Sequence, residues 1–155
     1  NQHVSEVLDL YRSRALNGEI DERLVFDDAV IDGDAGRLRQ VLHNLVKNAL
    51  EAVRDAADAR IMVSTCAVNT VETGQVELCI EDNGPGFGAE VLENIFEPYV
   101  STKPKGSGLG LAIVKKIVEE HNGTISAESG ASGGALIRIR FMLSSEHGSA
   151  TENLA

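Results

Sequence analysis

The chain has 155 residues, of which 14 are Lys or Arg and 24 are Asp or Glu, giving a formal charge of −10 with histidine neutral. With 43% apolar and 25% charged residues, it has the composition of a globular domain rather than of a disordered or fibrous protein. The acidic balance argues against nucleic acid or an anionic membrane as the main partner. No apolar run approaches the roughly 20 residues of a membrane-spanning helix. The first residue is Asn rather than Met, so we expect a piece of a longer protein.

The predicted elements alternate between helices and strands without a regular rhythm. In chain order they are a short helix within residues 1–17, two very short strands at 24–26 and 29–31, a long amphipathic helix at about 35–56, strands at 61–71 and 75–81, one or two helical turns within 88–95, a loop over 97–108, a helix over 109–121, and strands at 124–128 and 135–143. Residues 144–155 are polar, and we expect a disordered tail. This order favours an α+β fold with helices on one face of a mixed sheet.

The two cysteines, Cys66 and Cys79, lie in alternating apolar stretches and form no Cys-x-x-Cys or Cys/His cluster. We therefore expect buried, reduced thiols rather than a metal–thiolate site.

One edge of the long helix carries polar residues whose chemistry suits a metal ion. On a helical wheel, Arg37, Asn44, Asn48 and Glu51 fall within about 60° of one another, beside the apolar stripe. The amide oxygens of the two asparagines could ligate a hard cation such as Mg²⁺, which often shares its ligands with phosphates. The alternative is structural, because both amides could instead satisfy backbone groups at a buried edge.

An acid followed by Gly-x-Gly ends the strand at 75–81. If Asp82 is functional, its carboxylate is an acceptor suited to an exocyclic amine, and Gly84 and Gly86 let a flat ligand lie against the backbone. The alternative is a plain turn.

The helix at 109–121 opens on a glycine-rich segment, Gly106-Ser107-Gly108-Leu109-Gly110-Leu111. Glycines expose backbone N–H groups at a helix N-terminus, where an anion is stabilised, and Lys103 and Lys105 lie just before them. A flexible hinge is the alternative. The segment is not a P-loop, because no Gly-Lys-Ser/Thr occurs in the chain, and Leu111 stands where the dinucleotide fingerprint needs glycine.

Together, in this order, the three motifs describe a site for Mg²⁺, a purine and a polyphosphate. They resemble the ATP-binding domain shared by sensor histidine kinases, type II topoisomerases, mismatch-repair ATPases and heat-shock chaperone ATPases. Residues 43–52 resemble the N box of that family, 82–87 the G1 box, 95–99 the F box, 106–111 the G2 box, and Gly133-Gly134 the last glycine box. The resemblance covers roughly residues 24–142. It implies a Bergerat-type two-layer α/β sandwich with a mixed sheet of about five strands and helices on one face.

The residue at position 44 distinguishes the branches of the family. The ATP-hydrolysing branches have a glutamate there that activates water, whereas this chain has Asn44. The resemblance therefore favours the histidine-kinase branch. Ser101-Thr102-Lys103 and residues 109–123 are further similar to the nitrogen-regulation type of sensor kinase (the NtrY/NtrB type).

The resemblance also implies a role for each matching residue. Asn48 would hold Mg²⁺ with Asn44 beside it, Asp82 would accept from the adenine amine, and Lys103 and Lys47 would meet phosphate. The implied ATP-binding set is Asn44, Lys47, Asn48, Glu51, Asp82, Gly84, Gly86, Ile95, Phe96, Tyr99, Thr102, Lys103, Gly106, Ser107, Gly108, Leu109, Gly110 and Leu111. Ile95, Phe96 and Tyr99 would line the base of a lid over about residues 97–107. The family usually has threonine where this chain has Ala135, which predicts weaker nucleotide binding.

The four histidines, His3, His43, His121 and His147, do not match a phosphoacceptor motif. His43 belongs to the N box, and His121 ends a helix, where a cation suits the helix dipole. We therefore expect a protein-histidine kinase domain that lacks its phosphoacceptor and is inactive alone.

The expected organisation is the end of a dimerisation helix or a linker at 1–17, the ATP-binding catalytic domain at 18–143 and the tail at 144–155. ATP and Mg²⁺ are the expected cofactors. The expected partners are its own dimerisation domain and a response regulator, with no nucleic acid. This chain would be a monomer and the full-length protein a homodimer. By resemblance it would be the cytoplasmic part of an inner-membrane receptor. A free-standing ATPase, a degenerate docking module and a kinase acting on protein serine are the rival interpretations.

Overall fold

The computed structural model of the chain describes residues 1–12, 18–24, 30–69, 74–101, 106–130 and 133–144. Its helices are α1 (Gln2–Arg12), α2 (Ala35–Ala52), α3 (Ala89–Leu92) and α4 (Gly110–Glu120). Its strands are β1 (Gly18–Leu24), β2 (Ala59–Asn69), β3 (Gly74–Asp82), β4 (Thr124–Ser129) and β5 (Ala135–Met142).

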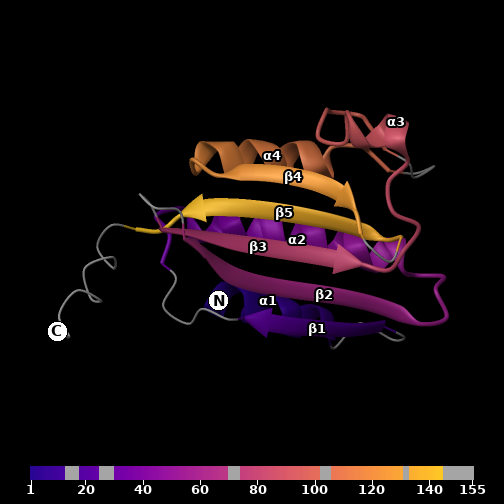
Figure 1. Ribbon diagram of the computed structural model, residues 1–155, viewed down its shortest axis with the longest axis horizontal. Helices are drawn as coiled ribbons and strands as arrows, with labels where there is room; N and C mark the ends of the chain where they lie inside the picture. Colours follow the sequence, from indigo (N-terminus) through magenta and orange to yellow (C-terminus); the bar gives the residue numbers. More distant parts are fainter. Residues whose placement is uncertain (13–17, 25–29, 70–73, 102–105, 131–132, 145–155) are drawn as a thin grey trace.

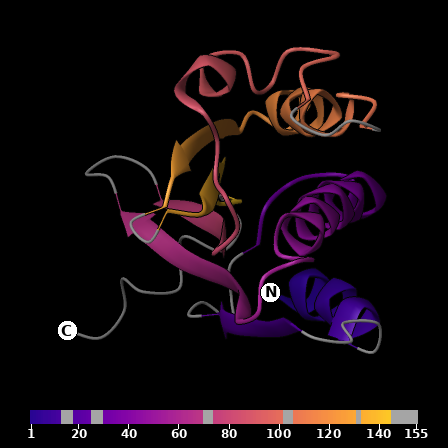
Figure 2. The same cartoon turned by 90° about the vertical axis from the view of Figure 1, so that its right-hand side faces the viewer.

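The five strands form one mixed sheet in the order β1-β2-β3-β5-β4, as Figure 1 shows. β1 runs parallel to β2, and every other pair is antiparallel. Helices α1, α2 and α4 lie on one face of this sheet (Figure 2). The predicted fold, a two-layer α/β sandwich with a mixed sheet of about five strands and helices on one face, is therefore confirmed.

The first strand is not where the sequence predicted it. The strand expected at 29–31 is wrong in its described part, because Val30 and Ile31 lie outside any strand. The strand expected at 24–26 meets the structure only at Leu24, the last residue of β1, and 25–29 fall outside the described residues. β1 is an edge strand, and Asp21 and Arg23 on it are exposed while Ile20 is 8% exposed. Its charged residues obscure the strand in the sequence, because an edge strand tolerates and even favours charge.

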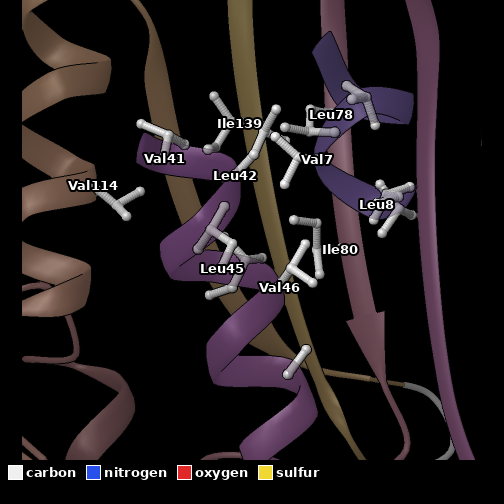
Figure 3. Packing of buried hydrophobic residues seen from close by; sticks show 14 of the residues in the cluster. Val7, Leu8, Val41, Leu42, Leu45, Val46, Leu78, Ile80, Val114 and Ile139 are labelled. Atoms are coloured by element: carbon white, nitrogen blue, oxygen red, sulfur yellow. The ribbon is translucent and has the colours of Figure 1, made fainter. Parts of the chain in front are cut away.

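The core lies between the sheet and α2. The apolar stripe of α2 buries Val41, Leu42, Leu45, Val46 and Ala49. Figure 3 shows Leu78, Ile80 and Ile139 of the sheet on one side of α2, and Val114 of α4 on the other. The helix begins at the predicted N-cap, Asp34, whose carboxylate accepts from the N–H of Arg37 at 3.0 Å. It ends at Ala52, earlier than the predicted 56, and Val53 to Asp55 continue as turns.

Helix α1 contributes to the same core. Its Val7 and Leu8 are 1% and 0% exposed, and the hydroxyl of Tyr11 lies 3.2 Å from Nδ1 of His43 on α2. The described part of residues 1–17 therefore shares one core with the rest of the domain. That these residues end a dimerisation helix or form a linker stays a prediction.

The opposite face of the sheet is left open by the helices and carries a charged cluster. The carboxylate of Glu77 lies between two arginines, with Nε of Arg140 at 2.6 Å and Nε of Arg138 at 3.4 Å. Both cysteines are free, but they are half-buried rather than buried as expected. Cys79 donates to Glu77, and burial raises the pKa of this thiol to about 11, so it stays protonated at neutral pH.

Metal clusters and membrane-spanning helices are both absent from the described residues. Among them, no three His, Cys, Asp or Glu side chains come together as a metal-binding group. In the same part of the chain, no helix has the length and apolar character needed to cross a membrane.

We predict that α1 stabilises the domain through Leu8. Leu8→Ala should lower the free energy of unfolding by about 2–5 kcal/mol, because it leaves a cavity in a closed core. Leu10, on the same helix, is 57% exposed, so Leu10→Ala should change this free energy by less than about 0.5 kcal/mol. Urea denaturation of both variants measures the difference. Equal losses would show that α1 is not part of the core in solution.

Candidate nucleotide-binding site

The polar edge of α2 faces α4 along its length. At one end Arg37 of α2 forms an ion pair with Glu120, the last residue of α4. At the other end a Cβ added to Gly110, the first residue of α4, would lie 3.8 Å from Nδ2 of Asn48. The two helices therefore run antiparallel, and the start of α4 lies beside Asn48.

The other polar residues on this edge are placed differently. Asn44 is half-buried one turn before Asn48. The Lys47 side chain is 67% exposed, and its ammonium lies 4.0 Å from the carboxylate of Glu51. The edge thus presents Asn48 beside the start of α4, Asn44 one turn earlier and Lys47 at its solvent side.

Asp82 supplies a buried carboxylate at the end of β3. The residue is 7% exposed, and its Oδ1 accepts hydrogen bonds from the N–H of Gly84 at 2.9 Å and of Ala135 at 3.4 Å. Backbone donors from the following loop and from β5 therefore fix the orientation of this carboxylate.

Close backbone contacts hold the loops around Asp82 together. A Cβ on Gly134 would lie 1.6 Å from the carbonyl oxygen of Asp82, so no residue except glycine fits there. Gly84 lies against the end of α2, where its Cβ would be 2.8 Å from the carbonyl oxygen of Ala52. The predicted site set omitted Gly134 and Ala135, although the Gly133-Gly134 pair was the signal that could have found them.

Asn83 also holds this loop, and sequence reasoning passed over it. Its side-chain oxygen accepts from the N–H of Arg60 at 2.8 Å, and its Nδ2 donates to the carbonyl of Asp58 at 2.6 Å. These bonds join the segment after Asp82 to the start of β2. An asparagine in a turn is too common for the sequence to single it out.

A backbone hydrogen bond joins the two ends of the predicted lid, at Tyr99 and Gly108. The N–H of Tyr99 donates to the carbonyl of Gly108 at 3.0 Å, and both residues have positive φ, 68° and 67°. Ile95 is buried and Phe96 packs against the core, whereas Tyr99 is 80% exposed among the described residues. Thr102 and Lys103 lie outside the described residues.

The glycine-rich segment leads directly into α4. Leu109 is the N-cap residue and makes no side-chain capping hydrogen bond, and the hydroxyl of Ser107 accepts from the Leu109 N–H at 3.4 Å. Gly106 and Ser107 are exposed, and Leu111 is half-buried in the first turn. The first N–H groups of a helix lack helical partners and favour an anion.

These three groups fit a magnesium nucleotide. A fixed carboxylate suits a purine amine, amide oxygens suit a hard cation, and a helix N-terminus suits phosphate. A single Mg²⁺ is bound in many enzymes by one or two protein oxygens together with substrate phosphates, so a cage of several acidic residues is not required.

Comparisons with known proteins agree with this chemistry. Residues 33–145 match the family described as histidine kinase-, DNA gyrase B- and HSP90-like ATPases. The chain is 38% identical to the sensory histidine kinase/phosphatase NtrB of Rhodobacter capsulatus over 88% of its length and 42% of that protein. Across the eight curated relatives compared, the chain spans between 16% and 42% of their length.

Two solved structures of kinases are similar over 92% of this chain. The nucleotide-free catalytic domain of histidine kinase ThkA has a TM-score of 0.79 and 30% identity, and 91% of it is covered. Full-length ShkA in complex with AMPPNP has a TM-score of 0.76 and 27% identity, and 30% of it is covered.

Proposed function

The chain belongs to the family of histidine kinase-, DNA gyrase B- and HSP90-like ATPases, on its sensor histidine kinase branch, and we propose that it binds Mg·ATP and donates the γ-phosphoryl group to a histidine on another domain. The observation that carries this proposal is that the side chain of Asn48 lies beside Gly110, the first residue of α4. It brings a metal-ligand amide to the place where backbone N–H groups can receive phosphates.

Each part of the nucleotide then has a named partner. Asp82 accepts from the adenine amine, and the backbone at Gly84 and Gly86 lets the base lie flat. The segment from Gly106 to Leu111 offers N–H groups to the phosphates. Lys47 and Lys103 add positive charge near them, and Lys47 must leave Glu51 to do so.

Asn48, with Asn44 beside it, would hold Mg²⁺, which supplies neutralising charge on the phosphates when bound. The chain itself contributes position rather than acid–base chemistry. Helix α4 aligns the terminal phosphate, and Asn44 offers no carboxylate to activate water. In the transfer, the bond between the γ-phosphorus and the ADP oxygen breaks and a phosphorus–nitrogen bond to imidazole forms.

Each histidine in the described part of the chain has a hydrogen-bond partner within the domain. His3 lies 3.2 Å from Glu6 on α1, His43 contacts Tyr11, and His121 accepts from the N–H of Asp34. His147 lies outside the described residues. These contacts support an acceptor on a separate dimerisation domain, with a response regulator as the next partner. We place the chain in a homodimeric receptor of the inner membrane, on its cytoplasmic side.

A free-standing ATPase of the same fold is the second candidate, and the amide at Asn44 argues against it. A degenerate docking module is the third, and the fixed carboxylate of Asp82 argues against that.

We predict that Asp82→Asn weakens Mg·ATP binding by at least about tenfold, since a hydrogen bond to a charged group contributes about 1.5–3 kcal/mol. The new amide oxygen can still accept from Gly84 and Ala135, so the fold should persist, but the amide nitrogen opposes the adenine amine. Calorimetric titration measures the affinity. Glu81→Gln, one residue earlier and on the open face of the sheet, is the matched control and should bind as the parent does.

The magnesium assignment makes a separate prediction. Asn48→Ala should leave ATP binding in EDTA unchanged and should abolish most of the gain in affinity that Mg²⁺ gives the parent. Titrations with and without Mg²⁺ supply the comparison. A variant that responds to Mg²⁺ like the parent would remove Asn48 from the metal site.

Phosphoryl transfer requires an acceptor histidine on another domain. Incubated with Mg²⁺ and γ-labelled ATP, the chain alone should neither release phosphate over many turnovers nor become labelled. With a separate dimerisation domain present, that domain should acquire an acid-labile, alkali-stable label. Sustained phosphate release by the chain alone would favour the free-standing ATPase instead.

A further inference from the structure

We propose that His121 is a positioning residue that fixes the axial position of α4 against α2, and thereby the separation between the phosphate-binding start of α4 and Asn48. This inference rests on the proposed function. His121 follows the last residue of α4, about 16 Å along the helix axis from Gly110. It therefore acts through α4 and does not touch the nucleotide.

Two hydrogen bonds assign the donor and acceptor roles of the two His121 ring nitrogens. Nε2 accepts from the backbone N–H of Asp34 at 3.0 Å, and Nδ1 lies 2.7 Å from the carbonyl oxygen of Ile117, to which it must donate. The tautomer with its proton on Nδ1 satisfies both bonds. In this arrangement Nε2 of the ring is an acceptor for the start of α2.

The partner of His121 is the residue that starts α2. Asp34 is the N-cap, and its carboxylate accepts from the N–H of Arg37, a bond that holds the pKa of Asp34 below its usual value. A Cβ on Gly33 would lie 2.4 Å from Cδ2 of His121, so the ring occupies space that any other residue would fill. The end of α4 is thus bound directly to the fixed first turn of α2.

The other contacts between α2 and α4 set the axial position less sharply. Apolar packing at Val114 and Ile117 is non-directional. The ion pair between Arg37 and Glu120 joins side chains that are 44% and 42% exposed, and exposed pairs of this kind contribute little. An axial shift of α4 by about 1.5 Å, the rise of one helical residue, would change the separation between the start of α4 and Asn48.

The two halves of the nucleotide site are built from different elements. The adenine half is built from β3, β5 and the end of α2, whereas the phosphate half needs α4. A change confined to the position of α4 should therefore weaken binding of Mg·ATP and leave binding of adenosine unchanged.

The test compares His121→Leu and His121→Gln with the parent chain. His121→Leu removes both hydrogen bonds and should weaken Mg·ATP binding about fivefold, as expected for one neutral hydrogen bond, with adenosine affinity within about twofold by NMR titration. Glutamine retains an acceptor that can reach the Asp34 N–H, so His121→Gln should recover most of the affinity. Glu120→Gln, which loses only the exposed ion pair at the same junction, is the control.

Several outcomes would overturn the proposal: equal losses for Mg·ATP and adenosine in folded His121→Leu, no recovery by glutamine, or the same loss in Glu120→Gln. If His121→Leu does not fold, the imidazole ¹⁵N shifts of the parent test the proposal instead. They should show the proton on Nδ1 and an accepting Nε2, and a proton on Nε2 would overturn the proposal. A parent that binds adenosine but not Mg·ATP, or neither, would instead count against the proposed function, since the variants play no part in that result.

Discussion

Helix α2 packs against the sheet with its apolar stripe and against α4 with its polar edge, and the candidate site depends on both contacts. Its apolar stripe is closed against the sheet by Leu45 and Val46, which are 2% and 0% exposed, so it cannot rotate without opening the core. With that rotation fixed, Asn48 lies beside α4. The packing of the apolar stripe in the core therefore also fixes the direction in which the polar edge of α2 faces. This packing is enough to place Asn48 beside the start of α4.

The loops around Asp82, which we propose to hold the purine, rely on a different constraint, the close approach of backbones. The backbone of Gly134 lies against the carbonyl oxygen of Asp82, and that of Gly84 lies against the last turn of α2. The two loops and the end of α2 therefore approach one another with little room for side chains between them. The carboxylate of Asp82 is then bonded by N–H groups from both loops. These hydrogen bonds and close contacts orient the carboxylate before any ligand binds, and such preorganisation reduces the entropy lost on binding.

Periodicity and motif chemistry made part of the structure predictable from the sequence. The apolar stripe of α2, its Asp34 N-cap and strands β2 to β5 were predictable because helical periodicity, capping residues and strand alternation are local patterns. β1 was misplaced because an edge strand carries charges that break the alternation. The role of His121 was missed because its partner, the N–H of Asp34, is 87 positions away and is a backbone group. The exposure of Tyr99 was not predicted. Its positive φ and its hydrogen bond to Gly108, nine residues away, leave no recognisable pattern in the sequence.

The charge of the chain explains why position matters so much here. A chain of net charge −10 repels a polyphosphate at long range, and the repulsion falls off over a Debye length of about 10 Å in 0.1 M salt. Binding must therefore come from groups in direct contact, such as the N–H groups at the start of α4 and the cation that we propose Asn48 holds. Hydrogen bonds to phosphate depend on donor–acceptor distance and angle. A hydrogen bond at the far end of α4 can therefore change affinity at its start, since it helps to set the position of the N–H groups there.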